Sequence, residues 1–216
     1  MQVLLFLHRL YFFVILNIRN KKTYKMKKII FLFIISSLIS IKGIGLTLSP
    51  ETEVSILTCA PGNELYSLFG HTAIRINDPR HQIDRVYNYG TFDFSTPHFY
   101  LKYARGLLPY QLTVQKFSHF IYNYQLEERT VYAQTIRLEK QRIFDLLEEN
   151  LLPQNRYYLY NFLFDNCTTR SRDILLKSLP DSVAWNMPDV NKNFWNLLDE
   201  YLQASPWVQW GIHTIL

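Results

Sequence analysis

The chain has 216 residues, of which 48% are hydrophobic, and this length and composition favour one well-packed domain over a disordered chain. The formal net charge of +5 comes from the first 45 residues, which hold eight basic residues and no acidic one. The remaining 15 basic and 18 acidic residues give about −3, so we expect no nucleic-acid partner.

Residues 1–45 are predicted to be a leader. A basic stretch that begins at Met26, which we also consider as the true start of the protein, precedes an apolar segment of 13 residues at 29–41. That segment is short for a bilayer span, and small residues up to Gly45 favour cleavage after Gly45. The remaining chain is then periplasmic or otherwise exported. The alternative is membrane association through an uncleaved anchor at residues 1–42.

The domain at residues 46–216 is predicted to mix strands and helices. Strands or extended runs are expected at 54–59, 71–76, 85–90, 110–117, 129–138 and 156–164, and helices at 64–69, 96–106, 139–152, 167–179 and 193–202. The strands at 71–76 and 85–90 are expected to pair as a hairpin. This pattern predicts an α+β fold, an antiparallel sheet packed against helices. The apolar end "WGIHTIL" leads us to expect a domain truncated at its C-terminus.

Cys167 is the strongest candidate for a reactive side chain. It follows Asp165-Asn166 at the predicted start of the helix 167–179, where the helix dipole and free backbone N–H groups lower the pKa of a thiol. The same N–H groups can stabilise an oxyanion that forms next to the sulfur. A nucleophilic thiol also needs a base, usually a histidine, that is itself held by a polar group.

Of the six histidines, His71 is the best candidate for that base. It opens the predicted strand 71–76 directly after Gly70, and a glycine at such a point allows another backbone or a ligand to approach closely. The orienting group is expected from the following segments, which offer Asn88 or, as the alternative, Asp93.

A structural interpretation competes with this one. Two cysteines in an exported protein most often form a disulfide, so a Cys59–Cys167 bond is the alternative to a catalytic Cys167. The domain would then be a non-catalytic envelope module that binds glycan or a partner protein. Arg170 and Arg172 are candidates for binding an anionic group. No HxH, HExxH or CxxC spacing occurs, and neither a metal nor a cofactor is expected.

Four segments together resemble one known family. They are "LTCAPGNELYSLFGHTAIRI", "VYNYGTFDF", "YARGLLPYQL" and "YNFLFDNCTTRSRDIL", and they are similar to the DUF4105 family, also called the Lnb N-terminal periplasmic domain. The resemblance covers about residues 50–210. The order of histidine before cysteine is similar to the circularly permuted branch of the NlpC/P60 and papain-like superfamily of thiol hydrolases, which includes lecithin–retinol acyltransferase relatives.

This resemblance implies a permuted papain-like fold in which His71 opens a strand and Cys167 begins a helix. It extends to Asn88 and Asn166 as further site residues, and Cys59 also belongs to the family pattern. The expected function is that of an exported cysteine-dependent amidase, peptidase or acyltransferase. Its expected substrate is an amide or ester of the cell envelope, either a peptidoglycan peptide or a lipid acyl group.

Overall fold

The computed structural model describes residues 45–98, 101–102, 105–137, 139–180 and 191–215, together with Lys28 and Phe31. The chain separates into two units, Met1–Leu46 and Thr47–Leu216, and the helices and strands named below belong to the second. The predicted leader at 1–45 therefore lies almost entirely outside the described residues.

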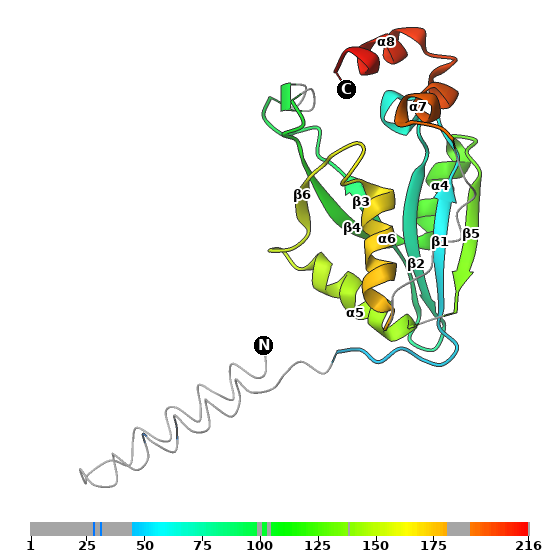
Figure 1. Ribbon diagram of the computed structural model, residues 1–216. Coiled ribbons are helices and arrows are strands. Elements are labelled where there is room, and N and C mark those ends of the chain that lie inside the picture. The colour runs from blue at the N-terminus through cyan, green and yellow to red at the C-terminus, as the bar shows by residue number, and fades with distance from the viewer. Residues whose placement is uncertain are drawn as a thin grey trace. The chain divides into compact units, whose positions relative to one another are not determined.

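The second unit is built on one antiparallel sheet with the strand order β5-β1-β2-β3-β4-β6 (Figure 1). The strands are β1 Glu53–Cys59, β2 His71–Asp78, β3 Ile83–Thr91, β4 Pro109–Lys116, β5 Val131–Ile136 and β6 Tyr157–Leu159. The helices are the 3-10 turn η1 Leu65–Ser67, α4 Phe117–Leu126, α5 Lys140–Leu151, α6 Cys167–Ser178, α7 Phe194–Leu202 and α8 Pro206–Ile215. The predicted α+β class is confirmed.

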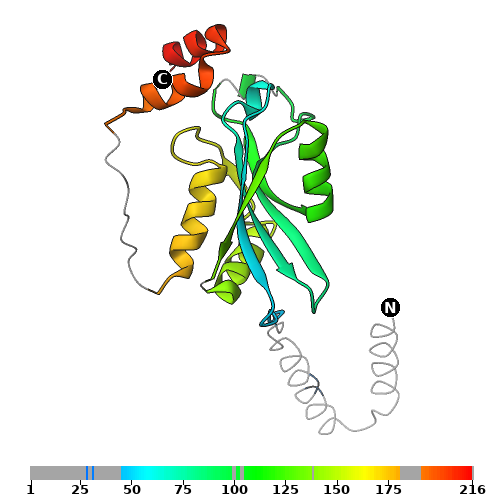
Figure 2. The same cartoon turned by 90° about the vertical axis from the view of Figure 1, so that its right-hand side faces the viewer.

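Helices cover both faces of the sheet, with α5 and α6 on one face and α4 on the other (Figure 2). Because side chains alternate along a strand, Ile74 and Tyr87 join the core beneath α5 and α6. Their neighbours Ala73 and Val86 pack against Phe120 of α4 on the opposite face. Full burial of a large apolar side chain contributes about 1.5–3 kcal/mol, so both helical layers stabilise the sheet.

Most predicted elements are confirmed, and three regions differ. The helices expected at 139–152 and 167–179 are α5 and α6, and the hairpin of β2 with β3 is present. Residues 117–126 form α4, although no helix was predicted there, and α8 was also not predicted. The extended run expected at 156–164 narrows to β6, which is followed by turns. The helix expected at 96–106 falls partly outside the described residues.

β2 and β3 separate before either strand ends. Their pairing stops at Ile74↔Tyr87, although β2 continues beside β1 as far as His71. β3 instead stays with β4, and its register shifts between Asn88 and Thr91. Bulges of this kind bend a strand. We call the opening between residues 71–73 and 88–91 the β2–β3 fork, and α6 packs on both of its strands.

Candidate active site

Cys167 is the first residue of α6, and Asn166 determines where that helix begins. The Asn166 side-chain oxygen accepts hydrogen bonds from the backbone N–H groups of Thr168 and Thr169 at 2.9 and 3.0 Å. In return, the Thr169 hydroxyl accepts from the Asn166 N–H at 2.8 Å, which completes a capping box. Asn166 therefore has the geometry of a helix cap. The Asn166 side chain does not accept from the backbone N–H of Cys167, which is another donor at the tip of this helix.

The Cys167 side chain lies in the β2–β3 fork. The His71 side chain and the backbone N–H of Thr72 both act on the pKa of the Cys167 thiol, so both lie near its sulfur. From the β3 side, a Cβ atom added to Gly90 would stand 3.6 Å from the Cβ of Cys167. The Thr168 hydroxyl is 4.0 Å from the sulfur. Both strands of the fork therefore surround the thiol, which is only partly exposed.

His71 is held by Asn88. Nε2 of His71 lies 3.1 Å from Oδ1 of Asn88, a side chain that is buried in β3. Because an amide oxygen only accepts hydrogen bonds, Nε2 carries the proton in this pair. In the neutral ring Nδ1 is then the nitrogen able to take a proton from the thiol.

The backbone approach expected at Gly70 is present. Gly70 has a φ of +73°, and an added Cβ atom would lie 2.5 Å from the carbonyl oxygen of Cys59. A side chain at this position is therefore excluded by both conformation and space. His71 consequently enters β2 at a fixed point opposite Cys59, its register partner in β1.

The pKa of the Cys167 thiol is lower than that of an ordinary cysteine. Burial by itself raises this pKa, but the hydrogen bond and charge of His71 and the hydrogen bonds of Thr72 and Thr168 together outweigh burial. The positive end of α6 favours the same change. A larger fraction of Cys167 is therefore ionised near neutral pH than of a free cysteine.

Tyr158 and Thr72 also lie at the site, and no local pattern in the sequence indicates either of them. Tyr158 in β6 is buried, and its hydroxyl oxygen faces the backbone N–H of Gly90. Among the described residues this hydroxyl makes no hydrogen bond of ordinary length and angle. Burial raises the pKa of the phenol, so it keeps its proton near neutral pH. The Arg170 guanidinium lies 3.7 Å from the centre of the Tyr158 ring.

The predicted alternative of a Cys59–Cys167 disulfide is wrong, because both cysteines are free thiols. Cys59 packs with Leu57 and Phe120 on the α4 face of the sheet, whereas Cys167 packs with the core on the other face. Burial raises the pKa of Cys59 to about 11, so this thiol stays protonated near neutral pH. Of the two cysteines, only Cys167 has the surroundings of a nucleophile.

Asp93, the alternative candidate for orienting His71, does not have that role. Its carboxylate accepts from the backbone N–H and the hydroxyl of Ser95 at 2.8 and 2.7 Å in an exposed turn after β3. The partner of His71 is therefore Asn88, the other candidate.

The two arginines considered for anion binding are already paired. Arg170 donates to both carboxylate oxygens of Asp165 at 2.6 and 2.7 Å, and Arg172 donates to its neighbour Asp173. Both guanidinium groups on α6 therefore already have a carboxylate partner. Within the described ranges, no group of three or more His, Cys, Asp or Glu side chains is arranged to hold a metal ion.

Residues 46–199, which are more than half of the chain, match the family described as the Lnb N-terminal periplasmic domain. None of the curated proteins and none of the solved structures compared with the chain matches it. In the part of the chain that the structure describes, no helix combines the length and the apolar character needed to cross a bilayer.

Proposed function

We infer a function from two facts, that the chain belongs to the Lnb N-terminal periplasmic domain family and that its Cys167 thiol has a lowered pKa beside His71. The domain acts as a periplasmic thiol hydrolase or acyltransferase on an amide or ester. The observation that carries this proposal is the convergence of His71, Asn88 and Cys167 in the β2–β3 fork. A similar order of residues in permuted NlpC/P60-like enzymes supports it.

The first half of the reaction transfers the acyl group to sulfur. His71 accepts the thiol proton, and the Cys167 thiolate attacks the carbonyl carbon of the substrate to form a C–S bond. The Cys167 backbone N–H and the Tyr158 hydroxyl are the donors for the oxyanion. The C–N or C–O bond then breaks, His71 returns its proton to the leaving amine or alcohol, and a thioester remains on Cys167.

The second half releases the acyl group. A water molecule, or the hydroxyl or amine of an acceptor, attacks the thioester while His71 takes its proton. The C–S bond breaks and the thiolate leaves, so the product is either a free acid or a new ester or amide. Asn88 supports both halves because it keeps the imidazole ring in one orientation throughout.

The first substrate proposed is an amide of a cell-wall peptide, because the family is periplasmic. A lipid acyl group is the second, since aromatic rings lie close to the thiol along the chain. Phe162 packs on Phe69 with 4.8 Å between ring centres, and Phe164 is 69% exposed beside Phe194. Exposed apolar rings of this kind suit an acyl chain. Membrane association through residues 1–42 would favour the lipid.

Alkylation by iodoacetamide tests the proposed nucleophile. We expect rapid labelling of Cys167 near neutral pH, no comparable labelling in Cys167→Ala, and slower labelling in His71→Ala. Cys59→Ala is the matched control and keeps the wild-type rate, because the buried Cys59 thiol stays protonated. An unreactive Cys167 in the folded protein at neutral pH would contradict the proposal.

Turnover distinguishes the substrates. The wild type and Cys167→Ala are incubated separately with purified peptidoglycan fragments and with phospholipid vesicles, and the released products are measured by mass spectrometry. Products that depend on Cys167 from one of these materials identify the acyl donor. If Cys167 is reactive but the protein turns over neither material, the enzyme proposal is refuted for both substrate classes.

A further inference from the structure

The loop between β6 and α6 presents a large apolar side chain to solvent on a braced backbone. Asn161 and Asp165 exchange two backbone hydrogen bonds at 2.9 and 3.0 Å, and the Asn161 side chain accepts from the backbone N–H of Phe164 at 3.0 Å. Arg170 in turn holds the Asp165 carboxylate. Phe164 is nevertheless 69% exposed, three residues before Cys167. The loop therefore fixes an exposed aromatic ring close to the nucleophile along the chain.

α7 continues this exposed apolar surface. Phe194, Leu197 and Tyr201 are spaced at i, i+3 and i+7, so they share one face of the helix. Their side chains are exposed although all three are large and mostly apolar. The rings of Phe164 and Phe194 pack edge-on with 6.3 Å between their centres, which joins the loop to the helix.

The other end of the α7 face returns to the second catalytic residue. Tyr201 packs on Phe69 with 5.9 Å between ring centres, and Phe69 precedes His71 by two residues. Figure 1 shows α7 at the end of the sheet where α6 begins. We call the set of Phe69, Phe164, Phe194, Leu197 and Tyr201 the apolar strip. It connects the segment before Cys167 with the segment before His71.

The charged residues of α7 are already paired, so the apolar strip offers no charge to a ligand. Asp199 accepts from Gln209 and from His213 at 2.7 Å each, and Glu200 pairs with Lys192. An ionic ligand would find no free partner among these groups. The strip is therefore suited to an uncharged, apolar ligand.

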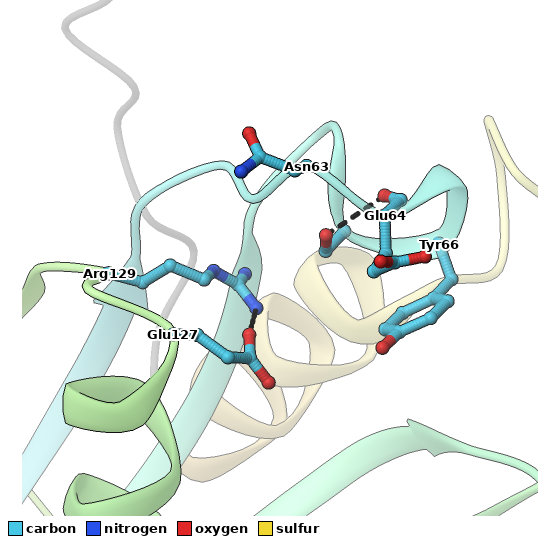
Figure 3. Close-up of a pocket in the computed structure, with 6 residues that line it drawn as sticks. Asn63, Glu64, Tyr66, Glu127 and Arg129 are labelled. Carbon is cyan, nitrogen blue, oxygen red and sulfur yellow. Dashed lines mark hydrogen bonds and ion pairs between the residues drawn. The ribbon is translucent and has the colours of Figure 1, made fainter.

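A polar hollow lies where η1 ends, two residues before Phe69. Figure 3 shows its lining, which consists of Asn63, Glu64, Tyr66, Ser67, Glu127 and Arg129. An apolar chain placed there would remove water from carboxylates without replacing their hydrogen bonds, which is unfavourable. The polar hollow therefore marks where the apolar surface stops, and a ligand of the strip follows α7 instead.

We propose that the apolar strip binds the hydrocarbon chain of an acyl substrate whose carbonyl group is presented to Cys167. This inference rests on the proposed function, and of its two substrate classes it selects the lipid acyl group. Three residues span at most about 11 Å, so Phe164 is within that distance of Cys167. A chain of several CH₂ groups reaches the Phe164 ring, whereas an acetyl group ends beside the sulfur. Phe164 and Leu197 are then specificity-determining residues.

The chain-length dependence of acyl transfer from p-nitrophenyl esters tests the proposal. The Cys167 thiolate attacks the ester carbonyl, the C–O bond breaks, and the release of nitrophenolate gives the second-order rate constant. Each CH₂ group fully removed from water favours binding about fourfold, so coverage equivalent to about two such groups gives more than tenfold. We therefore expect the octanoate ester to react at least about tenfold faster than the acetate ester.

Two variants of the strip and one matched control locate the effect. Phe164→Ala and Leu197→Ala should each lower the ratio of octanoate to acetate reactivity about threefold or more. Because the acetate ester reports on the thiol in the same variant, a general loss of structure cannot imitate a change in this ratio. Tyr122→Ala removes an exposed aromatic ring of α4, on the other face of the sheet, and should keep the wild-type ratio.

A binding measurement separates this proposal from the proposed function. If the acetate ester does not acylate Cys167, the proposed function fails, and dansyl-labelled undecanoic acid then tests the strip alone. We expect it to bind Cys167→Ala saturably and about tenfold more weakly when Phe164→Ala is added. Equal reactivity of the two esters, a ratio that neither variant changes, or no saturable binding of the fatty acid would each overturn the proposal.

Light scattering tests the other possible occupant, a second copy of this chain. We expect the wild type to have the mass of a monomer at the concentrations of the ester assay. A dimer that Phe164→Ala or Leu197→Ala dissociates would show that the strip is an interface between copies, and the proposal would then be wrong.

Discussion

Replacing Asn88 by alanine tests how the site controls its histidine. The substitution removes the acceptor that lies 3.1 Å from Nε2 of His71. Asn88 is 6% exposed, so water does not readily take the place of the lost oxygen. His71 then loses the hydrogen bond that determines its tautomer and holds its ring in place.

The expected effect follows from the strength of that bond. A hydrogen bond to a charged group contributes about 1.5–3 kcal/mol, and about 1.4 kcal/mol is a factor of ten in an equilibrium constant. The charge of His71 is one of the groups that lower the pKa of Cys167. The thiolate population of Asn88→Ala near neutral pH should therefore fall at least about tenfold, and its reactivity should appear only at higher pH.

The assay is the rate of iodoacetamide alkylation of Cys167 measured from about pH 5 to pH 9. Asn88→Asp keeps an acceptor for His71 and should keep the thiol reactive near neutral pH, and Asn77→Ala changes an asparagine of β2 outside the site. If Asn88→Ala is folded by its thermal melt and still shows the wild-type rate and pH profile, the reasoning about His71 is wrong.

Three further predictions concern the fold around the site. Gly70→Ala should lower the free energy of unfolding, measured in urea titrations, by about 3 kcal/mol, because the new Cβ atom lies 2.5 Å from a backbone oxygen and the positive φ is strained. Gly106→Ala is the control: its φ is +63° but the space around it is open, so it should lower the free energy of unfolding by about 1 kcal/mol. Asp78→Asn should destabilise by about 2 kcal/mol at neutral pH, since the buried carboxylate accepts four hydrogen bonds. Burial raises the pKa of Asp78, but its hydrogen bonds lower that pKa more. The stability that the Asp78 carboxylate contributes is therefore present above about pH 4 and is lost on acidification. Urea titrations at several pH values measure this loss. Asn166→Ala and Asn193→Ala each remove a capping box worth about 1 kcal/mol, but only the first should slow alkylation of the thiol.

The two helices α6 and α4 differ in how clearly their ends can be predicted from the sequence. α6 is bounded by Asn166, whose side chain caps it, and by Pro180, and both are recognisable along the chain. α4 has no comparable marker, since Lys116 at its N-cap position makes no side-chain capping bond and only Phe120 is buried. Its aromatic residues favour strands as well as helices. Packing of Phe120 against the sheet therefore decides its structure.

Some residues of the candidate site can be predicted from local sequence, and others only from the fold. His71 and Cys167 each follow a residue with a clear local role, Gly70 and Asn166, so the sequence could indicate both. Thr72 and Tyr158 come from different strands, and they meet the thiol only because of the strand register and the order of the sheet. Neither property can be read from local composition.

The β2–β3 fork divides the sheet into two half-sheets, β5-β1-β2 and β3-β4-β6, at one end. His71 belongs to the first and Asn88 to the second, so the hydrogen bond between them spans the opening. Spreading of the half-sheets would lengthen that hydrogen bond, and we expect it to weaken the hold on His71 beside Cys167. We therefore expect the alkylation rate of this thiol to report on the separation of the two half-sheets at this end of the sheet.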